Sequence, residues 1–176
     1  KHAMANLALL KDELREDELF HKYLDIVKTI SKRIDTSKIT IEVRMMHSER
    51  SSRSLKGTRP TNEKLYEAVA KDLAVRSRLT ELKATLAVEI DLLEMTLEAT
   101  NGHLRTKYVE YFDSYKNVEE KKMLGKKILL RGHELAQSLQ SAQSHIDMII
   151  KDIDQAGFSM RNMVDLFKIL HERTPV

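Results

Sequence analysis

The rarity of residues that interrupt a helix is the strongest constraint on the fold of this chain. Its 176 residues include only 5 glycines and 2 prolines, while 32% are charged and 5% are aromatic. Glycine and proline end helices and mark turns, so a chain with few of them favours a few long helices over many short strands. The composition therefore predicts an all-α protein, elongated and built as a helical hairpin or bundle.

Apolar residues recur at helical spacing along three long segments, which we expect to be the main helices. The first spans residues 7–34, the second follows Pro60, and the third begins at Asn117, a helix-capping residue. In the third segment, the helical register of the apolar residues places Gly125 and Gly132 on the apolar side, where another helix could approach closely. Alternatively, both glycines simply weaken the helix. Apolar residues of the third segment step by four and three, a seam suited to a partner helix: Leu135, Leu139, Ala142, Ile146, Ile149 and Ile153.

A different period appears near residue 40. From Ile39 to Met45 apolar and polar residues alternate, which is the period of a half-buried strand. A single strand needs a partner, so we expect a short β segment at residues 39–45 that is either a β-augmentation segment or an extended linker.

The last long helix is expected to end at Gly157, because glycine readily takes the left-handed conformation that ends helices. Phe158 would then fold back onto Ile153, and Ser159 would cap a short amphipathic helix. The result would be a C-terminal helix-turn-helix with an apolar face that needs a cover. The chain is thereby divided into an N-terminal helix with a short extended segment, a basic Ser/Arg loop, a long-helix core and a C-terminal hinge with its short helix: residues 4–46, 47–60, 61–156 and 157–176.

Basic charge is concentrated in two segments, although the net charge is only +3. Residues 38–59 carry six basic and two acidic side chains, and residues 104–131 carry eight and four. Brought together, the two segments could line a track for a polyanion; an ordinary solvated mixture of charges is the alternative. The first segment includes four cations in the loop: Arg50, Arg53, Lys56 and Arg59.

Aromatic residues follow the basic pair Arg105 and Lys107. This combination is used by proteins that bind single-stranded nucleic acid, where cations contact phosphates and aromatic rings stack on bases. The four aromatic positions also share one helical face, so they fit the core of a bundle equally well: Tyr108, Tyr111, Phe112 and Tyr115.

The usual enzyme and membrane signatures are missing from the sequence. There is no cysteine, and the seven histidines show no zinc-binding spacing. The sequence has no glycine-rich phosphate loop, no nucleophile elbow and no second Glu-x-x-His beside the one at Glu18. We therefore expect no enzyme, no cofactor and no metal, and the absence of an apolar run of about 18 residues predicts no membrane span.

Two motifs resemble the UvsY-type recombination mediators of tailed phages. The first is Leu104-Arg105-Thr106-Lys107 followed by Glu110-Tyr111-Phe112. The second is Gly157-Phe158-Ser159-Met160-Arg161-Asn162-Met163-Val164-Asp165, and the resemblance extends over residues 79–170. Val109, inserted before Glu110, and the extended C-terminal tail depart from the family pattern.

The resemblance implies a ring-shaped helical homo-oligomer in the cytoplasm of a bacterial host. It implies binding to single-stranded DNA and the loading of a RecA-like recombinase in the presence of a single-strand binding protein. The resemblance assigns DNA contact to Arg105 and Lys107. The basic charge of residues 38–59, rather than the resemblance, adds the loop cations Arg50, Arg53, Lys56 and Arg59 to this expected contact. Assembly would fall to the C-terminal residues Gly157, Phe158, Met160, Met163, Val164 and Phe167. The alternative is a helical adaptor or scaffold that oligomerises and binds a protein partner without nucleic acid.

Overall fold

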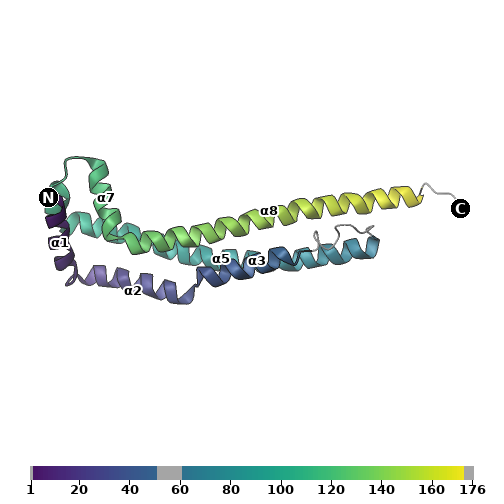
Figure 1. The fold of residues 1–176 in the computed structure, drawn as a ribbon, viewed down its shortest axis with the longest axis horizontal. Helices are drawn as coiled ribbons and strands as arrows, with labels where there is room; N and C mark the ends of the chain where they lie inside the picture. The colour runs from purple at the N-terminus through teal and green to yellow at the C-terminus, as the bar shows by residue number, and fades with distance from the viewer. Residues whose placement is uncertain (1, 51–60, 173–176) are drawn as a thin grey trace. The chain divides into compact units, whose positions relative to one another are not determined.

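Each described element is an α-helix, and no strand occurs in the described residues, so the predicted all-α class is confirmed. The computed structural model describes residues 2–50 and 61–172, with side chains from residue 7 onward. Helices α5 and α8 are 46 and 43 residues long, as expected for a chain with few helix breakers. The helices, shown in Figure 1, are α1 (His2–Leu14), α2 (Glu18–Arg33), α3 (Thr36–Ser48), α5 (Asn62–Lys107), α6 (Val109–Asp113), α7 (Val118–Ile128) and α8 (Leu130–Glu172).

The chain divides into two compact units, and the first is formed by residues Lys1–Asp35 and Ala87–Gln140. In this unit the N-terminal segment of the chain, which contains α1 and α2, packs on the second half of α5 and on the start of α8. The residues predicted to form helical apolar stripes are its core, because they are the ones withdrawn from solvent. The fully buried side chains of this unit include Leu10, Leu14, Tyr23, Ile30, Leu93, Leu104, Leu129 and Leu139.

The second unit consists of residues Thr36–Leu86 and Ser141–Val176. Here α8 runs antiparallel to the first half of α5, because Arg76 pairs with Asp154 and Lys83 with Asp147. Helix α3 lies along α5, where Arg78 contacts Glu42 at 3.0 Å. The predicted seam of α8 is buried in this unit at Ala142, Ile146, Ile149 and Ile153.

The first apolar segment is two helices rather than one. The chain turns at residues 15–17, and Asp17 then caps α2 by accepting a hydrogen bond from the Phe20 N–H at 2.9 Å. Aspartate is among the best N-cap residues, since its carboxylate satisfies a free N–H of the first turn. Its position inside an otherwise helical pattern therefore starts a new helix.

The predicted β segment at residues 39–45 is wrong, because α3 spans Thr36–Ser48. Ile39 and Val43 face inward at helical spacing, whereas Ile41 and Met45 are exposed. A helix satisfies its own backbone hydrogen bonds, while a single strand leaves them unpaired. Short alternating runs fit both periods, and in this case the helical one prevails.

The helix end predicted at Gly157 is also wrong, because α8 continues through this residue to Glu172. Phe158 is 62% exposed and does not fold back onto Ile153. Instead of capping a new helix, the Ser159 hydroxyl donates a hydrogen bond to the Gln155 carbonyl at 3.2 Å. The predicted helix-turn-helix is therefore replaced by a single continuous helix.

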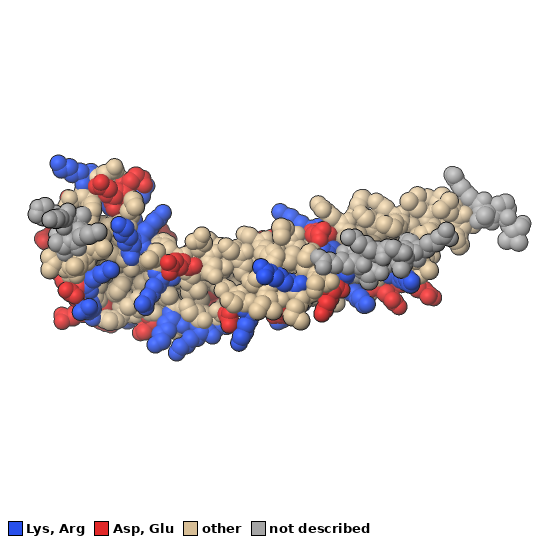
Figure 2. Space-filling model, viewed as in Figure 1, with Lys and Arg blue, Asp and Glu red and all other residues tan. Residues whose placement is uncertain are grey.

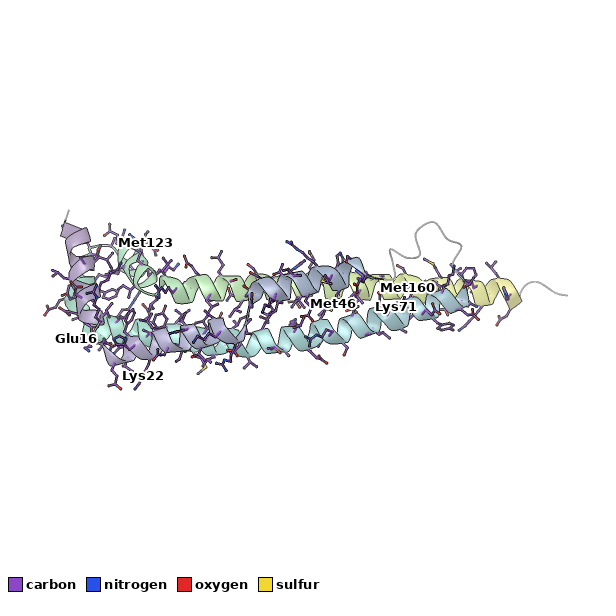
Figure 3. All side chains as sticks on the ribbon, turned by 60° about the horizontal axis from the view of Figure 1, so that its bottom comes forward. Glu16, Lys22, Met46, Lys71, Met123 and Met160 are labelled. Carbon is purple, nitrogen blue, oxygen red and sulfur yellow. The ribbon has the colours of Figure 1, made fainter. Side chains whose placement is uncertain are left out.

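Packing on both sides of Gly157 explains why the helix continues. Met160, only 4% exposed, packs against Leu65 and Ala68 of α5, and Val164 and Phe167 pack against the same cluster. Figure 3 labels Met160 where α8 lies beside α5. A glycine inside a helix costs only about 1 kcal/mol relative to alanine, so this burial outweighs it.

The third apolar segment starts where predicted but is interrupted. The Asn117 side chain caps α7 by accepting from the Glu119 N–H at 3.0 Å, which confirms its capping role. Helix α7 ends at Ile128, and the buried residue Leu129 connects it to α8. None of the described helices is long and apolar enough to cross a bilayer.

Candidate nucleic-acid interface

Arg105 and Lys107 occupy the last turn of α5, in the first unit. Residues two positions apart in a helix differ in direction by about 200°, so the two side chains leave the helix in different directions. Both are exposed, but their surroundings differ. Arg105 borders a cavity, whereas Lys107 binds a carboxylate of the N-terminal segment. Arg105 and Lys107 therefore lie in two distinct environments and do not form one basic patch.

The Lys107 partner is Asp17, the buried residue that caps α2. Its side chain is 1% exposed and binds four donors. Lys107 Nζ lies 2.8 Å away, and the Tyr108 hydroxyl donates at 2.7 Å. The His103 Nε2 lies at 2.9 Å, and the Phe20 N–H donates at 2.9 Å. This arrangement, which we call the Asp17 cluster, joins the start of α2 to the end of α5.

Opposing effects set the ionisation of the Asp17 cluster. Burial by itself raises the pKa of Asp17, but the hydrogen bonds from Lys107, His103, Phe20 and Tyr108 lower it well below its usual range. The hydrogen bond to Asp17 raises the pKa of Lys107. Asp17 is consequently charged at neutral pH, and part of the Lys107 charge is neutralised within the protein.

Arg105 lies on a cavity of about 200 Å³ that we call the Arg105 cavity. Two lysines of α7, Lys122 and Lys126, and His133 of α8 also border it. Glu98 supplies the carboxylate of the lining. Three permanent cations around one acidic group create a positive potential that favours a small anion such as a phosphate.

The charges around the Arg105 cavity are differently engaged. Lys122 pairs with Glu119 one turn earlier, at 3.0 Å, on an exposed part of α7. Arg105 and Lys126 form no ion pair with the described side chains. Burial and the charge of Lys126 lower the pKa of His133, so its ring is mainly neutral at pH 7. An anion in the cavity would favour the protonated ring.

Close helix packing builds the Arg105 cavity. A Cβ on Gly125 would lie 2.8 Å from the Asn101 Oδ1, so glycine lets α7 approach α5 at this level. In the first turn of α8, a Cβ on Gly132 would lie 2.7 Å from Leu97 Cδ2 and 2.8 Å from the Tyr23 hydroxyl. The prediction that these glycines allow close approach is thus confirmed. The approach brings Lys122, Lys126 and His133 next to Arg105.

Of the four predicted loop cations, only Arg50 lies within the described residues, and it does not form part of the Arg105 cavity. Arg50 is 3% exposed and forms an ion pair with Asp152 of α8, while Asp72 of α5 lies 3.7 Å away. Its guanidinium is therefore committed to neighbouring carboxylates inside the second unit and presents little charge to solvent. The other three predicted loop contacts lie outside the described residues: Arg53, Lys56 and Arg59.

The aromatic residues after the basic pair belong mainly to the core. Tyr108 and Phe112 are 6% and 3% exposed, as the bundle-core interpretation predicted. Tyr111 is half-buried, and its hydroxyl donates to Glu13 of α1. Tyr115 is also half-buried. Tyr108 and Phe112 are therefore not available for stacking on bases.

The residues predicted to mediate assembly divide between two surroundings. Met160 is buried, and Val164 and Phe167 are half-buried, on the side of α8 that packs against α5. Phe158 and Met163 are 62% and 41% exposed. Some of the predicted assembly residues therefore make contacts within the chain, and only Phe158 and Met163 among those named here are exposed to solvent.

Sequence reasoning missed three residues of the Arg105 cavity: Lys122, Lys126 and His133. The charge count had marked residues 104–131 as basic, but their convergence depends on how α5, α7 and α8 pack. The face drawn in Figure 2 carries many Lys and Arg side chains over the first unit, mixed with Asp and Glu. Comparison with protein-family models, with curated proteins and with solved structures finds no match to this chain.

Proposed function

We propose that this protein is a single-stranded DNA-binding recombination mediator that acts as a homo-oligomer and helps load a RecA-like recombinase. The observation that carries the DNA-binding part is the Arg105 cavity. Three cations from two helices border it, and a residue of the basic motif is one of them. A backbone phosphate matches this charge and requires no particular base sequence. The mediator role and the recombinase partner rest on the resemblance of the two motifs alone.

The end of α8 supports assembly. Phe158, Leu166 and Ile169 are 62%, 59% and 46% exposed, while the opposite side of the same segment packs on α5. A helix that is apolar on both its packed and its exposed sides indicates a contact with another protein. A second copy of the chain is the proposed occupant. The same surface favours the alternative function, a helical adaptor that binds a different protein without nucleic acid.

The experiment that tests DNA binding is a salt series with a single-stranded oligonucleotide. Replacing Arg105 and Lys126 together by Gln should weaken binding and reduce the slope of log K against log salt by about 1.4, since each lost phosphate contact on a single strand contributes about 0.7. The matched control replaces two exposed lysines of the second unit, Lys64 and Lys71, by Gln. It removes the same charge and should retain most of the slope.

The outcomes separate the two functions. Equal losses in both double variants would show that net charge, rather than the Arg105 cavity, governs binding. An absence of binding to single-stranded DNA at low salt, with oligomeric mass unchanged, would favour the adaptor. Light scattering with and without the oligonucleotide supplies the mass measurement.

A further inference from the structure

A second cavity lies in the first unit, bordered by α1, α2, α7 and α8. Its volume is about 390 Å³, nearly twice that of the Arg105 cavity. A volume in this range suits a small organic ligand rather than a single inorganic ion. We call it the Phe20 pocket, after the aromatic residue that borders it.

The lining of the Phe20 pocket combines apolar and cationic groups. Leu14, Phe20 and Tyr23 supply apolar and aromatic surface. Lys11, Lys127 and Arg131 supply three positive charges, and no Asp or Glu is among the described residues that line the pocket. These three cations form no ion pair with the described side chains. A matching ligand is therefore an anion with a flat apolar part.

The aromatic side chains of the pocket offer ring surface rather than hydrogen bonds. The Tyr23 hydroxyl is already engaged, since it donates to the Leu129 carbonyl at 3.0 Å and accepts from the Gly132 N–H at 2.9 Å. The Phe20 ring is half-buried, and its centroid lies 5.5 Å from that of Tyr23. Phe20 thus keeps part of its ring accessible beside a ring that is fixed in place. An aromatic surface next to free cations is the arrangement that binds a base and its phosphate.

Helix α7 connects this pocket to the Arg105 cavity. The neighbouring residues Lys126 and Lys127 border the Arg105 cavity and the Phe20 pocket, respectively. Because successive helical residues differ in direction by about 100°, one helix serves both sites. A single strand that crosses α7 would meet a phosphate site on one side and an aromatic pocket on the other.

We propose that the Phe20 pocket binds one unpaired nucleotide, with the base stacked on Phe20 and the phosphate held by Lys11, Lys127 and Arg131. This inference rests on the proposed binding of single-stranded DNA and adds a base contact to it. The contact is independent of base sequence, because every base has a flat face that can stack.

The test compares a single-stranded oligothymidylate with an abasic strand of equal length, using the full chain. The wild type should bind the strand with bases more tightly, and Phe20→Leu should weaken its binding about tenfold while leaving the abasic strand nearly unchanged. Phe20→Trp should retain the preference for bases, because it keeps a stacking surface. Circular dichroism and the thermal midpoint establish that both variants fold.

Mononucleotide binding provides an arm that does not depend on strand binding. Calorimetry compares thymidine monophosphate with hexyl phosphate and inorganic phosphate on the wild type and on Phe20→Leu. We expect thymidine monophosphate to bind best and Phe20→Leu to remove its advantage. Equal affinity for hexyl phosphate would overturn the base contact.

The two arms also distinguish this inference from the proposed function. Strand binding that is the same with and without bases, in wild type and Phe20→Leu alike, would overturn the Phe20 pocket and leave phosphate binding intact. Failure of both strands to bind would overturn the proposed function. In that case a preference for thymidine monophosphate that Phe20→Leu abolishes would still support a nucleotide pocket, and its absence would remove that too.

Discussion

The hydroxyl of Tyr23, in α2, accepts a hydrogen bond from the backbone N–H of Gly132, in the first turn of α8, at 2.9 Å. The same hydroxyl donates to the carbonyl of Leu129, where α7 gives way to α8. Tyr23 is 1% exposed, and burial raises the pKa of its hydroxyl, so the group stays protonated and keeps both bonds at physiological pH. One side chain of the N-terminal segment thus fixes a helix junction more than a hundred residues away.

Tyr23→Phe should therefore destabilise the protein although it removes a single oxygen atom. It leaves the buried Gly132 N–H without its partner and removes one of the two hydrogen bonds to the Leu129 carbonyl, which still accepts from the His133 N–H. This loss costs about 1–3 kcal/mol in the free energy of unfolding. Urea unfolding followed by circular dichroism measures the change. Tyr66→Phe is the control, because Tyr66 is 59% exposed and should change stability by less than about 0.5 kcal/mol. Equal effects of both substitutions would contradict the role of Tyr23.

Alanine substitutions at two glycines of α8 should have opposite signs. At Gly132 a Cβ would lie 2.7 Å from Leu97 Cδ2, so Gly132→Ala should destabilise by about 1–3 kcal/mol despite the better helix propensity of alanine. At Gly157 nothing lies within 4 Å of the added Cβ, so Gly157→Ala should stabilise by up to about 1 kcal/mol. Thermal unfolding compares the two variants. A destabilised Gly157→Ala variant would indicate that a bend at this glycine is needed after all.

Asp17→Asn tests the Asp17 cluster. Asparagine still caps α2, so the substitution removes mainly the charge that binds Lys107, and we expect a loss of about 1–3 kcal/mol at pH 7. The pKa of Asp17 lies below its ordinary value of 3.8, so its contribution is complete above that value and is lost as the pH falls further. The free energies of unfolding of wild type and variant should therefore converge in acid. Parallel curves down to the lowest accessible pH would show that the Asp17 charge is not what stabilises.

DNA binding should strengthen as the pH falls, because of His133. Burial and Lys126 hold the pKa of His133 below its ordinary value of 6.5, and a phosphate in the Arg105 cavity would raise it. Binding below neutral pH should then take up a proton, which calorimetry in two buffers of different ionisation enthalpy detects. His133→Gln should bind without this uptake. The same proton uptake in the variant would place its source elsewhere.

Phe158→Asp tests the assembly surface. Phe158 is exposed on the single chain, so the substitution should leave the monomer folded but place a charge in the proposed contact between copies. We expect a lower mass by light scattering at equal protein concentration. Lys151→Asp, at another exposed position of α8, is the control and should keep the wild-type mass. An unchanged mass for Phe158→Asp would remove this residue from the assembly surface.

The helices and the core could be predicted because they depend on patterns within one segment. Ile30, Leu86 and Ile146 belong to apolar stripes of helical period, and all three are buried. The errors arose where a local signal competes with packing: Gly157 permits a helix end, but Met160 and its contacts with α5 keep the helix going. Similarly, the alternation at Ile39 to Met45 carries no information about whether a partner strand exists.

The candidate site could be predicted only in part, for the same reason. Arg105 was identified from a motif within the chain. Lys122, Lys126 and His133 join it through the packing of three helices, which depends on Gly125, Gly132 and the junction at Leu129. No spacing along the sequence encodes that convergence.

The engagement of Lys107 with Asp17 changes how mutagenesis of the basic motif should be interpreted. The Lys107 charge connects the end of α5 to the start of α2 through Asp17. Removing this charge would therefore also loosen the packing of the helix end that carries Arg105. Reduced DNA binding by a Lys107 variant would therefore report a displaced scaffold as readily as a missing contact. Arg105 forms no such ion pair with the described side chains. Weaker DNA binding by an Arg105 variant can therefore be assigned to the lost contact with DNA.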